Sequence, residues 1–337
     1  MRAIQLDEYG PVENYRLVDV PEPSAGPGEV RIKVEYSGVR WGDVMNRRGT
    51  LVRPDPPFIV GLEVAGTVDE IGEGVTGYAV GDRVVSMVDE GGYAEYAVAP
   101  QHLLAKIDDD VALDKALAYF LNLRVAYMIV YPWAKVQEGE TVLLHAASGG
   151  VGFLVLQILK RRFQNVTVIG VCSSEEKAAK LRAAGCDHVI NRLTQDYVEE
   201  VTRIAGTKAT GYSNAAQAGQ GVDLSINGVS GPTIEGDMKV IRKRGRWLLF
   251  GRQAADRGAT IDTHQINYDG ITIMPFSIVA WFGQPEWEES LTFLNDWLAH
   301  EELNESMTWP LEEAAAAETA IENGKTVGKV VLKVARD

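Results

Sequence analysis

A strand, a tight turn and the start of a helix follow one another between Thr141 and Gly152, in the stretch TVLLHAASGGVG. The apolar run 142–144 favours a strand that is buried on both faces. Beyond the turn, apolar residues recur at the spacing of an amphipathic helix, at Val151, Leu154, Val155, Ile158 and Leu159. This order of elements is that of a nucleotide-binding βαβ unit.

The turn itself, Ala147-Ser148-Gly149-Gly150-Val151-Gly152, fits the pattern G-x-G-x-x-G with alanine in place of the first glycine. Backbone must approach a pyrophosphate closely at such a turn, and side chains longer than Cβ would block it. The free N–H groups and the positive dipole end of the following helix would then face the phosphates. We therefore predict that a dinucleotide binds at Gly149, Gly150, Val151 and Gly152.

Length and composition exclude several classes of protein. A chain of 337 residues favours two domains, and a net charge of −14 disfavours nucleic acid and anionic membrane surfaces as partners. No apolar run reaches the roughly 18 residues of a membrane span, and the N-terminus lacks the apolar core of a signal peptide. Only Cys172 and Cys186 are present, so a disulfide framework is not expected. We expect a cytoplasmic protein.

The first hundred residues consist of short strand-like segments separated by glycine and proline, which favours a small barrel or sandwich. Only Trp41 to Arg48 has a helical pattern there. The expected strands are 2–6, 15–20, 30–36, 64–71, 83–88 and 93–98.

A helical period between about 113 and 135 should cross into a second domain, in which strands and helices alternate as in a parallel sheet. The expected strands are 141–146, 166–172, 187–190, 222–226 and 246–250, and the expected helices are 151–163, 175–184, 195–205 and 232–242. After these, strand 271–276, helices 286–300 and 311–322, and strand 327–334 are expected, and this last part should return to the first domain. The stretch 206–221 is predicted to be a surface excursion or a short lid.

The type of dinucleotide should be decided at the end of the second Rossmann strand, where a carboxylate would hold the ribose of NAD. That strand ends in Cys172-Ser173-Ser174 without a carboxylate. Two hydroxyl groups, on Ser173 and Ser174, and two cations, Lys177 and Arg192, could bind a 2′-phosphate, which favours NADPH. The alternative is that both cations lie on solvated surfaces. Glu175 and Glu176 are also near, but acidic residues at a helix start usually point outward.

Beyond the glycine turn, several stretches of the chain resemble one protein family. They are Gly61-Leu62-Glu63-Val64-Ala65-Gly66, Val80-Gly81-Asp82-Arg83-Val84, Gly92-Tyr93-Ala94-Glu95-Tyr96, His145 to Gly152, and Val327-Gly328-Lys329-Val330-Val331-Leu332. In this order they resemble the zinc-independent branch of the medium-chain dehydrogenase/reductase superfamily, whose reference is the zeta-crystallin type of quinone oxidoreductase. Asn165-Val166-Thr167-Val168, Asp196-Tyr197-Val198 and Trp309-Pro310-Leu311-Glu312 further resemble the subgroup around the vesicle amine-transport protein 1 homologue.

The resemblance implies an α/β protein with a GroES-like β-barrel catalytic domain and an inserted Rossmann domain, a doubly wound parallel sheet. We expect the first part of the catalytic domain at 1–122, the NADP-binding domain at 123–262, and a return segment at 263–337. That return segment should complete the catalytic domain and carry a dimer edge strand. Family members are commonly homodimers, and residues 271–276 are our candidate for that strand.

The zinc-binding members of the superfamily hold their metal with Cys and His at places that are occupied here by Arg40, Met45 and Leu62. The chain also lacks a cysteine cluster, and its five histidines show no ligand spacing. We therefore predict no metal site. His145, on the first Rossmann strand, is expected to pack or to form a hydrogen bond.

The resemblance also proposes residues for catalysis. Arg40 takes the place of an Asn near the nicotinamide and could hold an anionic oxygen or a substrate carboxylate, or it could instead pair with Asp43 or Glu63. Tyr127 matches a family tyrosine and could face the cleft or belong to the core. Met45 stands where many relatives carry a Tyr proposed as a proton donor.

Five further positions follow from the same resemblance or from residue type. Trp41 and Met45 are expected to line the substrate pocket, although Trp41 could instead simply pack. Phe250 and Gly251 match the family position beside the ribose and nicotinamide, and Asn227 replaces a usual Asp with no evident consequence.

The sequence therefore predicts an NADPH-dependent oxidoreductase that transfers a hydride to a quinone or an α,β-unsaturated carbonyl compound without zinc. One alternative is an enoyl-thioester reductase, against which Met45 counts. Another is a cofactor-binding protein with little catalysis that acts by association.

Overall fold

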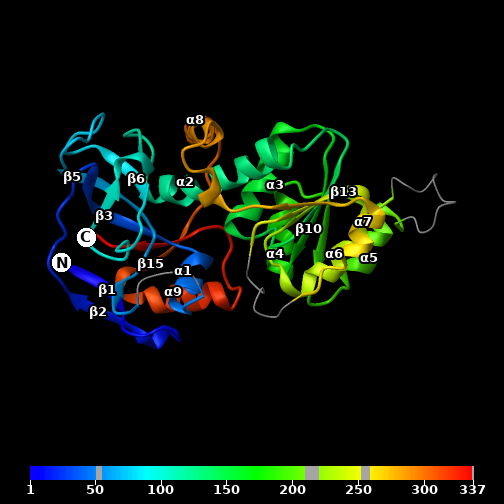
Figure 1. Ribbon diagram of the computed structural model, residues 1–337, viewed down its shortest axis with the longest axis horizontal. Helices are drawn as coiled ribbons and strands as arrows, with labels where there is room; N and C mark the ends of the chain where they lie inside the picture. The colour runs from blue at the N-terminus through cyan, green and yellow to red at the C-terminus, as the bar shows by residue number, and fades with distance from the viewer. Residues whose placement is uncertain (51–54, 209–219, 252–258, 336–337) are drawn as a thin grey trace. The chain divides into compact units, whose positions relative to one another are not determined.

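The computed structural model of the chain describes residues 1–50, 55–208, 220–251 and 259–335, and these form two compact units (Figure 1). One unit contains Met1–Asn122 together with Leu291–Asp337, so it is built from both ends of the chain. The other unit is the continuous stretch Leu123–Ser290. Each unit has a β-sheet and a hydrophobic core of its own.

The first unit is mainly antiparallel. A small sheet has the order β2-β1-β4, and a larger one has the order β15-β16-β3-β5-β6-β8 with β7 paired to β3. The strands are β1 (Arg2–Leu6), β2 (Tyr15–Asp19), β3 (Glu29–Val39), β4 (Phe58–Ile59), β5 (Glu63–Ile71), β6 (Arg83–Met87), β7 (Tyr96–Pro100), β8 (Leu104–Lys106), β15 (Met307–Pro310) and β16 (Val330–Lys333). Its helices are α1 (Trp41–Arg47) and α9 (Ala314–Glu322), while α2 (Leu113–Met128) and α8 (Pro285–His300) each extend into both units.

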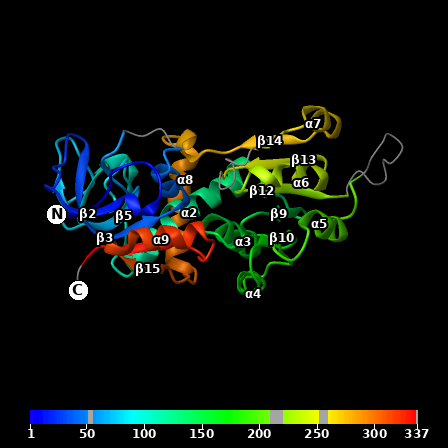
Figure 2. The ribbon, with the colours of Figure 1, turned by 90° about the horizontal axis from the view of Figure 1, so that it is seen from below.

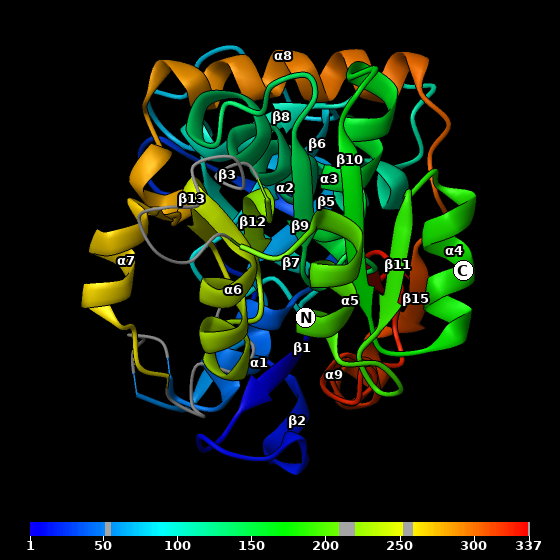
Figure 3. The same ribbon diagram turned by 90° about the vertical axis from the view of Figure 1, so that its right-hand side faces the viewer.

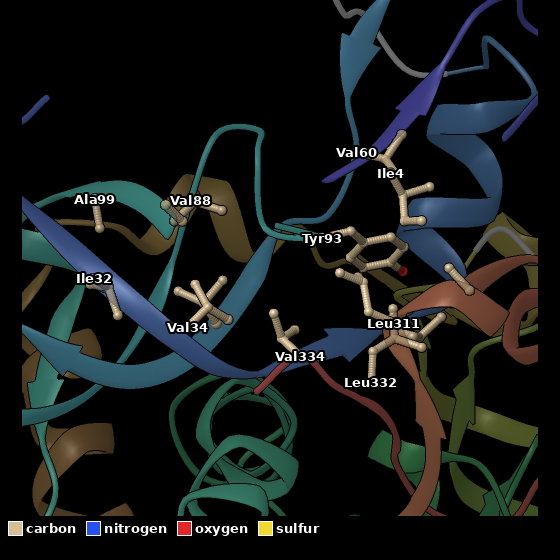
Figure 4. Close-up of a cluster of buried hydrophobic side chains, with 14 of the residues drawn as sticks. Ile4, Ile32, Val34, Val60, Val88, Tyr93, Ala99, Leu311, Leu332 and Val334 are labelled. Atoms are coloured by element: carbon tan, nitrogen blue, oxygen red, sulfur yellow. The ribbon is translucent and has the colours of Figure 1, made fainter. Parts of the chain in front are cut away.

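Strand β16 joins the two ends of the chain in the first unit. It pairs antiparallel with β3, with Val330 opposite Val39 and Leu332 opposite Ser37. Apolar side chains from both ends of the chain belong to one buried cluster, and Figure 4 labels Ile4, Ile32, Val34, Tyr93, Leu311 and Leu332 among them. Burial of this shared apolar surface favours the pairing of the two chain ends.

The second unit contains a parallel sheet of the order β11-β10-β9-β12-β13-β14. Figure 3 shows β11, β10, β9, β12 and β13 in this sequence from right to left. The strands are β9 (Thr141–Leu144), β10 (Thr167–Cys172), β11 (His188–Asn191), β12 (Val222–Asn227), β13 (Ile241–Leu249) and β14 (Thr272–Pro275). The sheet is wound outward in both directions from β9, so the order reverses between β9 and β12, which is where α/β sheets bind nucleotides.

Helices connect the parallel strands of the second unit. They are α3 (Gly150–Arg162), α4 (Glu175–Ala183), α5 (Tyr197–Ala205), α6 (Ile234–Val240) and α7 (Thr263–Asp269). After α2 the chain continues as a π-helical turn, Ile129–Trp133, which contains Pro132. Strand β14 lies beside β13 at one edge of the sheet (Figure 2). The α/β fold with a parallel Rossmann sheet is confirmed.

Several predicted boundaries were wrong. The helix expected at 232–242 ends at Val240, because Ile241 is buried in β13 opposite Val222. The strand expected at 93–98 lies at Tyr96–Pro100, where it pairs with β3. Strands β4, β8 and β15 were not predicted, since two to four residues carry too little periodicity. Most of the stretch 206–221, predicted as an excursion or lid, lies outside the described residues.

The helices and the two cysteines of the described residues bear on membrane spans and disulfides. No helix among the described residues is long and apolar enough to cross a membrane. Cys172 and Cys186 are free thiols, and both are buried.

Candidate functional site

The glycine turn closes the first βα unit of the parallel sheet. The carbonyl oxygen of Ala146 accepts a hydrogen bond from the backbone N–H of Gly149 at 2.9 Å, and Gly149 then caps α3. A Cβ on Gly152 would lie 2.4 Å from the same Ala146 oxygen, so only glycine fits there. No side chain caps α3, which leaves the N–H groups of its first turn available to a phosphate.

Strand β10 ends beside a group of hydroxyl and cationic side chains. Ser174 is the N-cap of α4, and its Oγ accepts from the backbone N–H of Lys177 at 3.3 Å. The Lys177 ammonium lies 3.5 Å from Ser173 Oγ, and the side chain is mostly buried. The structure therefore brings Ser173, Ser174 and Lys177 together at the edge where the ribose of a dinucleotide lies in this fold.

Arg192 belongs to the same strand end. Its backbone N–H donates to the carbonyl oxygen of Cys172 at 3.0 Å, which fixes it beside the last residue of β10. Burial lowers the pKa of Lys177, and the positive charge of Arg192 lowers it further. Arg192 itself is exposed, as the alternative of a solvated surface required, whereas Lys177 is not.

The two acidic residues at the start of α4 are directed elsewhere. Glu175 forms an ion pair with Arg182, and Glu176 lies 3.5 Å from Lys180, and both carboxylates are exposed. The expectation that they point outward is confirmed. Neither carboxylate takes part in the contact between Ser173 and Lys177.

The ends of β12 and β13 are held together by close backbone packing. A Cβ on Gly251 would lie 1.7 Å from the carbonyl oxygen of Gly228, and the backbone N–H of Phe250 donates to Asn227 at 3.1 Å. The hydroxyl of Ser230, a residue with the positive φ of 61°, donates to the Gly251 carbonyl at 2.6 Å. Phe250 and Gly251 thus sit in a fixed backbone crossing at the carboxyl edge of the sheet.

Asn227 is the residue that shapes this crossing. Its Oδ1 accepts from the backbone N–H groups of Val229 and Ser230, both at 2.9 Å. Its Nδ2 donates to Thr233 Oγ1 and to Asp237 Oδ2, both at 2.8 Å. An Asp in this place would have no N–H to donate, so the amide allows a hydrogen bond to a buried carboxylate.

That carboxylate, Asp237, is fully buried on α6 and gathers donors from four other elements or their ends. Around it lie His145 at 2.7 Å, Tyr197 at 3.2 Å, Ser225 at 2.7 Å, Asn227 at 2.8 Å and Trp247 at 2.9 Å. Burial raises the pKa of Asp237, but His145 and the donated hydrogen bonds outweigh it and hold the pKa below its usual value. The expectation that His145 forms a hydrogen bond is confirmed.

In the first unit, four charged side chains form what we call the Arg40 cluster: Arg40, Asp43, Glu63 and Lys329. Lys329 Nζ forms a close hydrogen-bonded ion pair with Glu63 Oε2. Arg40 Nη1 lies 3.3 Å from Glu63 Oε1, and Arg40 Nε lies 3.9 Å from Asp43 Oδ2. The ion pairing that was one of the alternatives for Arg40 is therefore present.

The members of the Arg40 cluster differ in exposure and in pKa. Asp43, Glu63 and Lys329 are buried, whereas the Arg40 side chain is 21% exposed. Burial raises the pKa of Asp43 to about 6. Burial also raises the pKa of Glu63, but the charges of Lys329 and Arg40 reverse this and leave it below its usual value. A cationic group thus forms the accessible member of an otherwise buried set.

Trp41 and Met45 lie on α1 directly after Arg40, and both are half-buried. The indole Nε1 of Trp41 is buried and has no hydrogen-bond partner among the described residues, and the guanidinium of Arg48 lies 5.9 Å from the ring. Leu62 is buried. Within the described ranges, no group of three or more His, Cys, Asp or Glu residues is placed to hold a metal ion.

Tyr127 lies in a different place from the other predicted site residues of the second unit. Its hydroxyl donates to Glu289 at 3.4 Å, and its ring lies 5.0 Å from that of Tyr131. Tyr131 in turn stacks on Phe163, which follows the last residue of α3. These ring contacts connect Tyr127 to the C-terminal end of α3, at the other end of that helix from the glycine turn.

Sequence reasoning did not identify Asp237, Ser230 or Lys329 as site residues. Asp237 sits within an amphipathic helix, where a lone carboxylate gives no signal of its partners. Lys329 was noted only as part of a matching motif.

Two family models match the chain. The alcohol dehydrogenase GroES-like domain matches residues 26–109, and the zinc-binding dehydrogenase model matches residues 150–296. The second match covers most of the unit that contains the parallel sheet.

Individual relatives agree with these models. The chain is 32% identical to the 2-haloacrylate reductase of a Burkholderia species, with 98% of both chains covered. It is 31% identical to the human synaptic vesicle membrane protein VAT-1 homolog-like, covering 77% of this chain and 58% of that protein. A mycobacterial protein solved in complex with NADPH is 32% identical, with a TM-score of 0.88 over 99% of this chain and 100% of that one.

The full-length match at this identity, the GroES-like unit built from both chain ends and the glycine turn of the parallel sheet all lead to one assignment. The chain belongs to the medium-chain dehydrogenase/reductase superfamily, in its quinone oxidoreductase branch, and is an oxidoreductase of the NAD(P)H-dependent type.

Proposed function

We propose that this protein is an NADPH-dependent reductase that delivers a hydride to a quinone or to an α,β-unsaturated carbonyl compound. The observation that supports it best is the strand end formed by Ser173, Lys177 and Arg192, where hydroxyl and cationic groups replace a ribose-binding carboxylate. A 2′-phosphate carries nearly two negative charges, and buried or neighbouring cations are its usual partners. The relative solved with NADPH supports the same choice.

Three groups of residues would hold the cofactor. Gly149, Gly150, Val151 and Gly152 would receive the pyrophosphate, because α3 begins there without a capping side chain. Ser173, Ser174, Lys177 and Arg192 would surround the 2′-phosphate. Phe250 and Gly251 would present backbone to the nicotinamide end. Bound there, NADPH supplies the hydride.

For the acceptor, the Arg40 cluster is proposed to do the work that a metal does in zinc-dependent relatives. Hydride addition to the far carbon of an enone places negative charge on the carbonyl oxygen, and a guanidinium stabilises such a charge by hydrogen bonds. Trp41 and Met45 are proposed to line the pocket. Met45 cannot donate a proton, so water is the proposed proton source and enoyl-thioester reduction through a tyrosine is disfavoured.

Tyr127 stays a proposal from the family resemblance, and it contacts Glu289 and Tyr131. The second alternative is a cofactor-binding protein that has little catalytic activity and acts by association. It would bind NADPH as our proposed reductase does but would not turn over an acceptor.

The domain boundaries and the assembly are also proposals. We propose a catalytic domain that begins at 1–122, a Rossmann domain at 123–262 and a return segment at 263–337. We propose a homodimer that forms through β14, because this strand is an edge of the parallel sheet and its second hydrogen-bonding side has no strand partner among the described residues. Two free thiols suit a reducing cytoplasm, which is the location we propose.

Turnover tests the central proposal. Purified protein is mixed with NADPH or NADH and with phenanthrenequinone, simple enones or crotonyl-CoA, and the loss of nicotinamide absorbance is followed. We expect oxidation of NADPH by the quinone or enones and little by the thioester. Tight NADPH binding without turnover of any acceptor would support the association function instead. A preference for NADH would contradict the role of the β10 end.

A further inference from the structure

The side chain of Arg40 is ion-paired but has little hydrogen bonding to its neighbours. A guanidinium has five N–H donors in a planar fork. The contact of Arg40 Nη1 with Glu63 is 3.3 Å, that of Nε with Asp43 is 3.9 Å, and Nε has no hydrogen-bond partner among the described residues. The charge of Arg40 is therefore balanced while its donors remain largely unused.

The reason lies in how the two carboxylates are already engaged. Glu63 is held by Lys329 through its Oε2 atom. Asp43 accepts the backbone N–H of Arg40 at 2.8 Å through Oδ2. The remaining oxygens, Glu63 Oε1 and Asp43 Oδ1, make no hydrogen bond within the described part of the chain. Lys329 therefore supplies the buried carboxylate of Glu63 with a positive charge and a hydrogen bond, and Arg40 is not needed for either.

The side chains of the Arg40 cluster also differ in solvent exposure. Arg40 is the one member of its cluster that solvent reaches, at 21% of its side chain, while Glu63, Asp43 and Lys329 are shielded. Arg40 is also the last residue before α1, so the half-buried Trp41 follows it directly and the half-buried Met45 lies one turn further along the helix. A charged fork beside apolar side chains is the arrangement that binds a small molecule with an acidic group at one end.

We propose that Arg40 binds the carboxylate of the substrate, and that the preferred acceptors are α,β-unsaturated carboxylic acids rather than neutral enones. This inference rests on the function proposed above. A bidentate pair of hydrogen bonds from the guanidinium would fix the carboxylate and orient the conjugated alkene.

The hydrogen bonds from Arg40 to the substrate carboxylate would also stabilise the negative charge that develops during the reaction. A hydride with its electron pair forms a new C–H bond at Cβ, the π electrons of the alkene move toward the carboxylate, and the oxygens then carry a second negative charge. A proton from water forms the C–H bond at Cα and returns the electrons from the oxygens. The alkene is reduced and NADPH is oxidised to NADP⁺. Arg40 stabilises the doubly charged stage more than the substrate, which accelerates the reaction.

A pair of substrates that differ in charge tests this inference. 2-Chloroacrylate and its methyl ester are compared by kcat/KM with NADPH, and phenanthrenequinone serves as a neutral acceptor. We expect the wild-type protein to prefer the acid. Turnover of the ester and the quinone but not of the acid would overturn the inference and leave the proposed function intact. Failure of all three would contradict the proposed function itself.

Variants of Arg40 test whether this residue causes the preference for the acid over the ester. Arg40→Gln should lower the ratio of kcat/KM for acid over ester about 30- to 100-fold, since a charged hydrogen-bonded pair is lost. Arg40→Lys, which keeps the charge but not the fork, should lower it about 10-fold. The matched control is Arg48→Gln at the end of the same helix, where Arg48 pairs with Glu322, and the ratio should not change. An unchanged ratio in Arg40→Gln would refute the assignment.

One further measurement distinguishes a substrate carboxylate from a cofactor phosphate as the anion that Arg40 binds. Propionate should inhibit the wild-type protein competitively with respect to the acid, while its methyl ester should not. If Arg40 instead contacted a phosphate of the cofactor, Arg40→Gln would weaken NADPH binding and leave the acid-to-ester ratio as it was, and propionate would not compete.

Discussion

The Nε2 atom of His145 lies 2.7 Å from Oδ1 of Asp237, and both side chains are buried. His145 directly precedes the glycine turn, and Asp237 also holds Asn227, which shapes the backbone beside Phe250. One carboxylate on α6 therefore fixes both the phosphate end and the nicotinamide end of the predicted dinucleotide edge.

Asp237→Asn should lower the free energy of unfolding by about 3–5 kcal/mol. The amide removes the negative charge opposite His145 and turns one acceptor into a donor that faces other donors, which leaves buried groups unsatisfied. Urea unfolding measures the change. Glu235→Gln is the control, because Glu235 is exposed on the same helix, and it should change stability by no more than about 0.5 kcal/mol. A loss below about 1 kcal/mol for Asp237→Asn would contradict the role of this carboxylate.

Lys177→Gln should weaken NADPH binding about 10- to 100-fold and leave NADH binding nearly unchanged, since one charged hydrogen bond to a 2′-phosphate is lost. Calorimetric titration with each nucleotide measures both constants. Lys180→Gln on the same helix provides the control, because Lys180 is exposed and lies near Glu176. Equal weakening of NADH and NADPH would show that Lys177 supports the fold of this edge and does not select the nucleotide.

Glu318→Gln should flatten the pH dependence of stability. Burial raises the pKa of Glu318 from 4.5 to about 7, although Arg47 at 2.8 Å and Tyr15 at 2.5 Å favour its ionised form. The folded protein then binds the proton more tightly than the unfolded chain. The resulting stability is fully present below pH 4.5 and is lost as the pH rises to about 7.

Unfolding measured at several pH values from about 4.5 to 7 should show this decline, on the order of a few kcal/mol, in the wild-type protein. The decline should be smaller in Glu318→Gln, which retains only the contribution of Asp43, whose pKa burial raises to about 6. Glu313→Gln, an exposed change just before α9, should keep the wild-type slope. The prediction is wrong if Glu318→Gln retains that slope.

Thr272→Lys should convert the proposed homodimer into monomers. Thr272 is exposed on β14, and a two-fold pairing of this edge would bring two like charges close together. Sedimentation at several concentrations measures the assembly. Val80→Lys is the control, because Val80 is exposed in the other unit and lies outside any strand. A wild-type protein that stays monomeric at high concentration would refute the dimer.

Local features of the sequence determined much of the fold. The apolar period after residue 141 placed β9 and α3 to within two residues, because alternation and helical spacing reflect which side of an element is buried. The position of the glycine turn was also visible in the sequence, because it depends on local chain geometry. A Cβ at position 152 would collide with the backbone oxygen of Ala146, six residues earlier, so glycine is required there. The absence of a carboxylate after β10 was likewise visible from the sequence.

Only the tertiary structure determines which charged and polar groups pair with one another. Glu63 pairs with Lys329, which lies 266 residues further along the chain, and this pairing leaves the donors of Arg40 unused. The amide of Asn227 matters because it donates a hydrogen bond to Asp237, a partner that no sequence pattern reveals. Periodicity reports which face of an element is buried, whereas the choice among oppositely charged partners depends on three-dimensional distance and shielding from water, which no local pattern encodes.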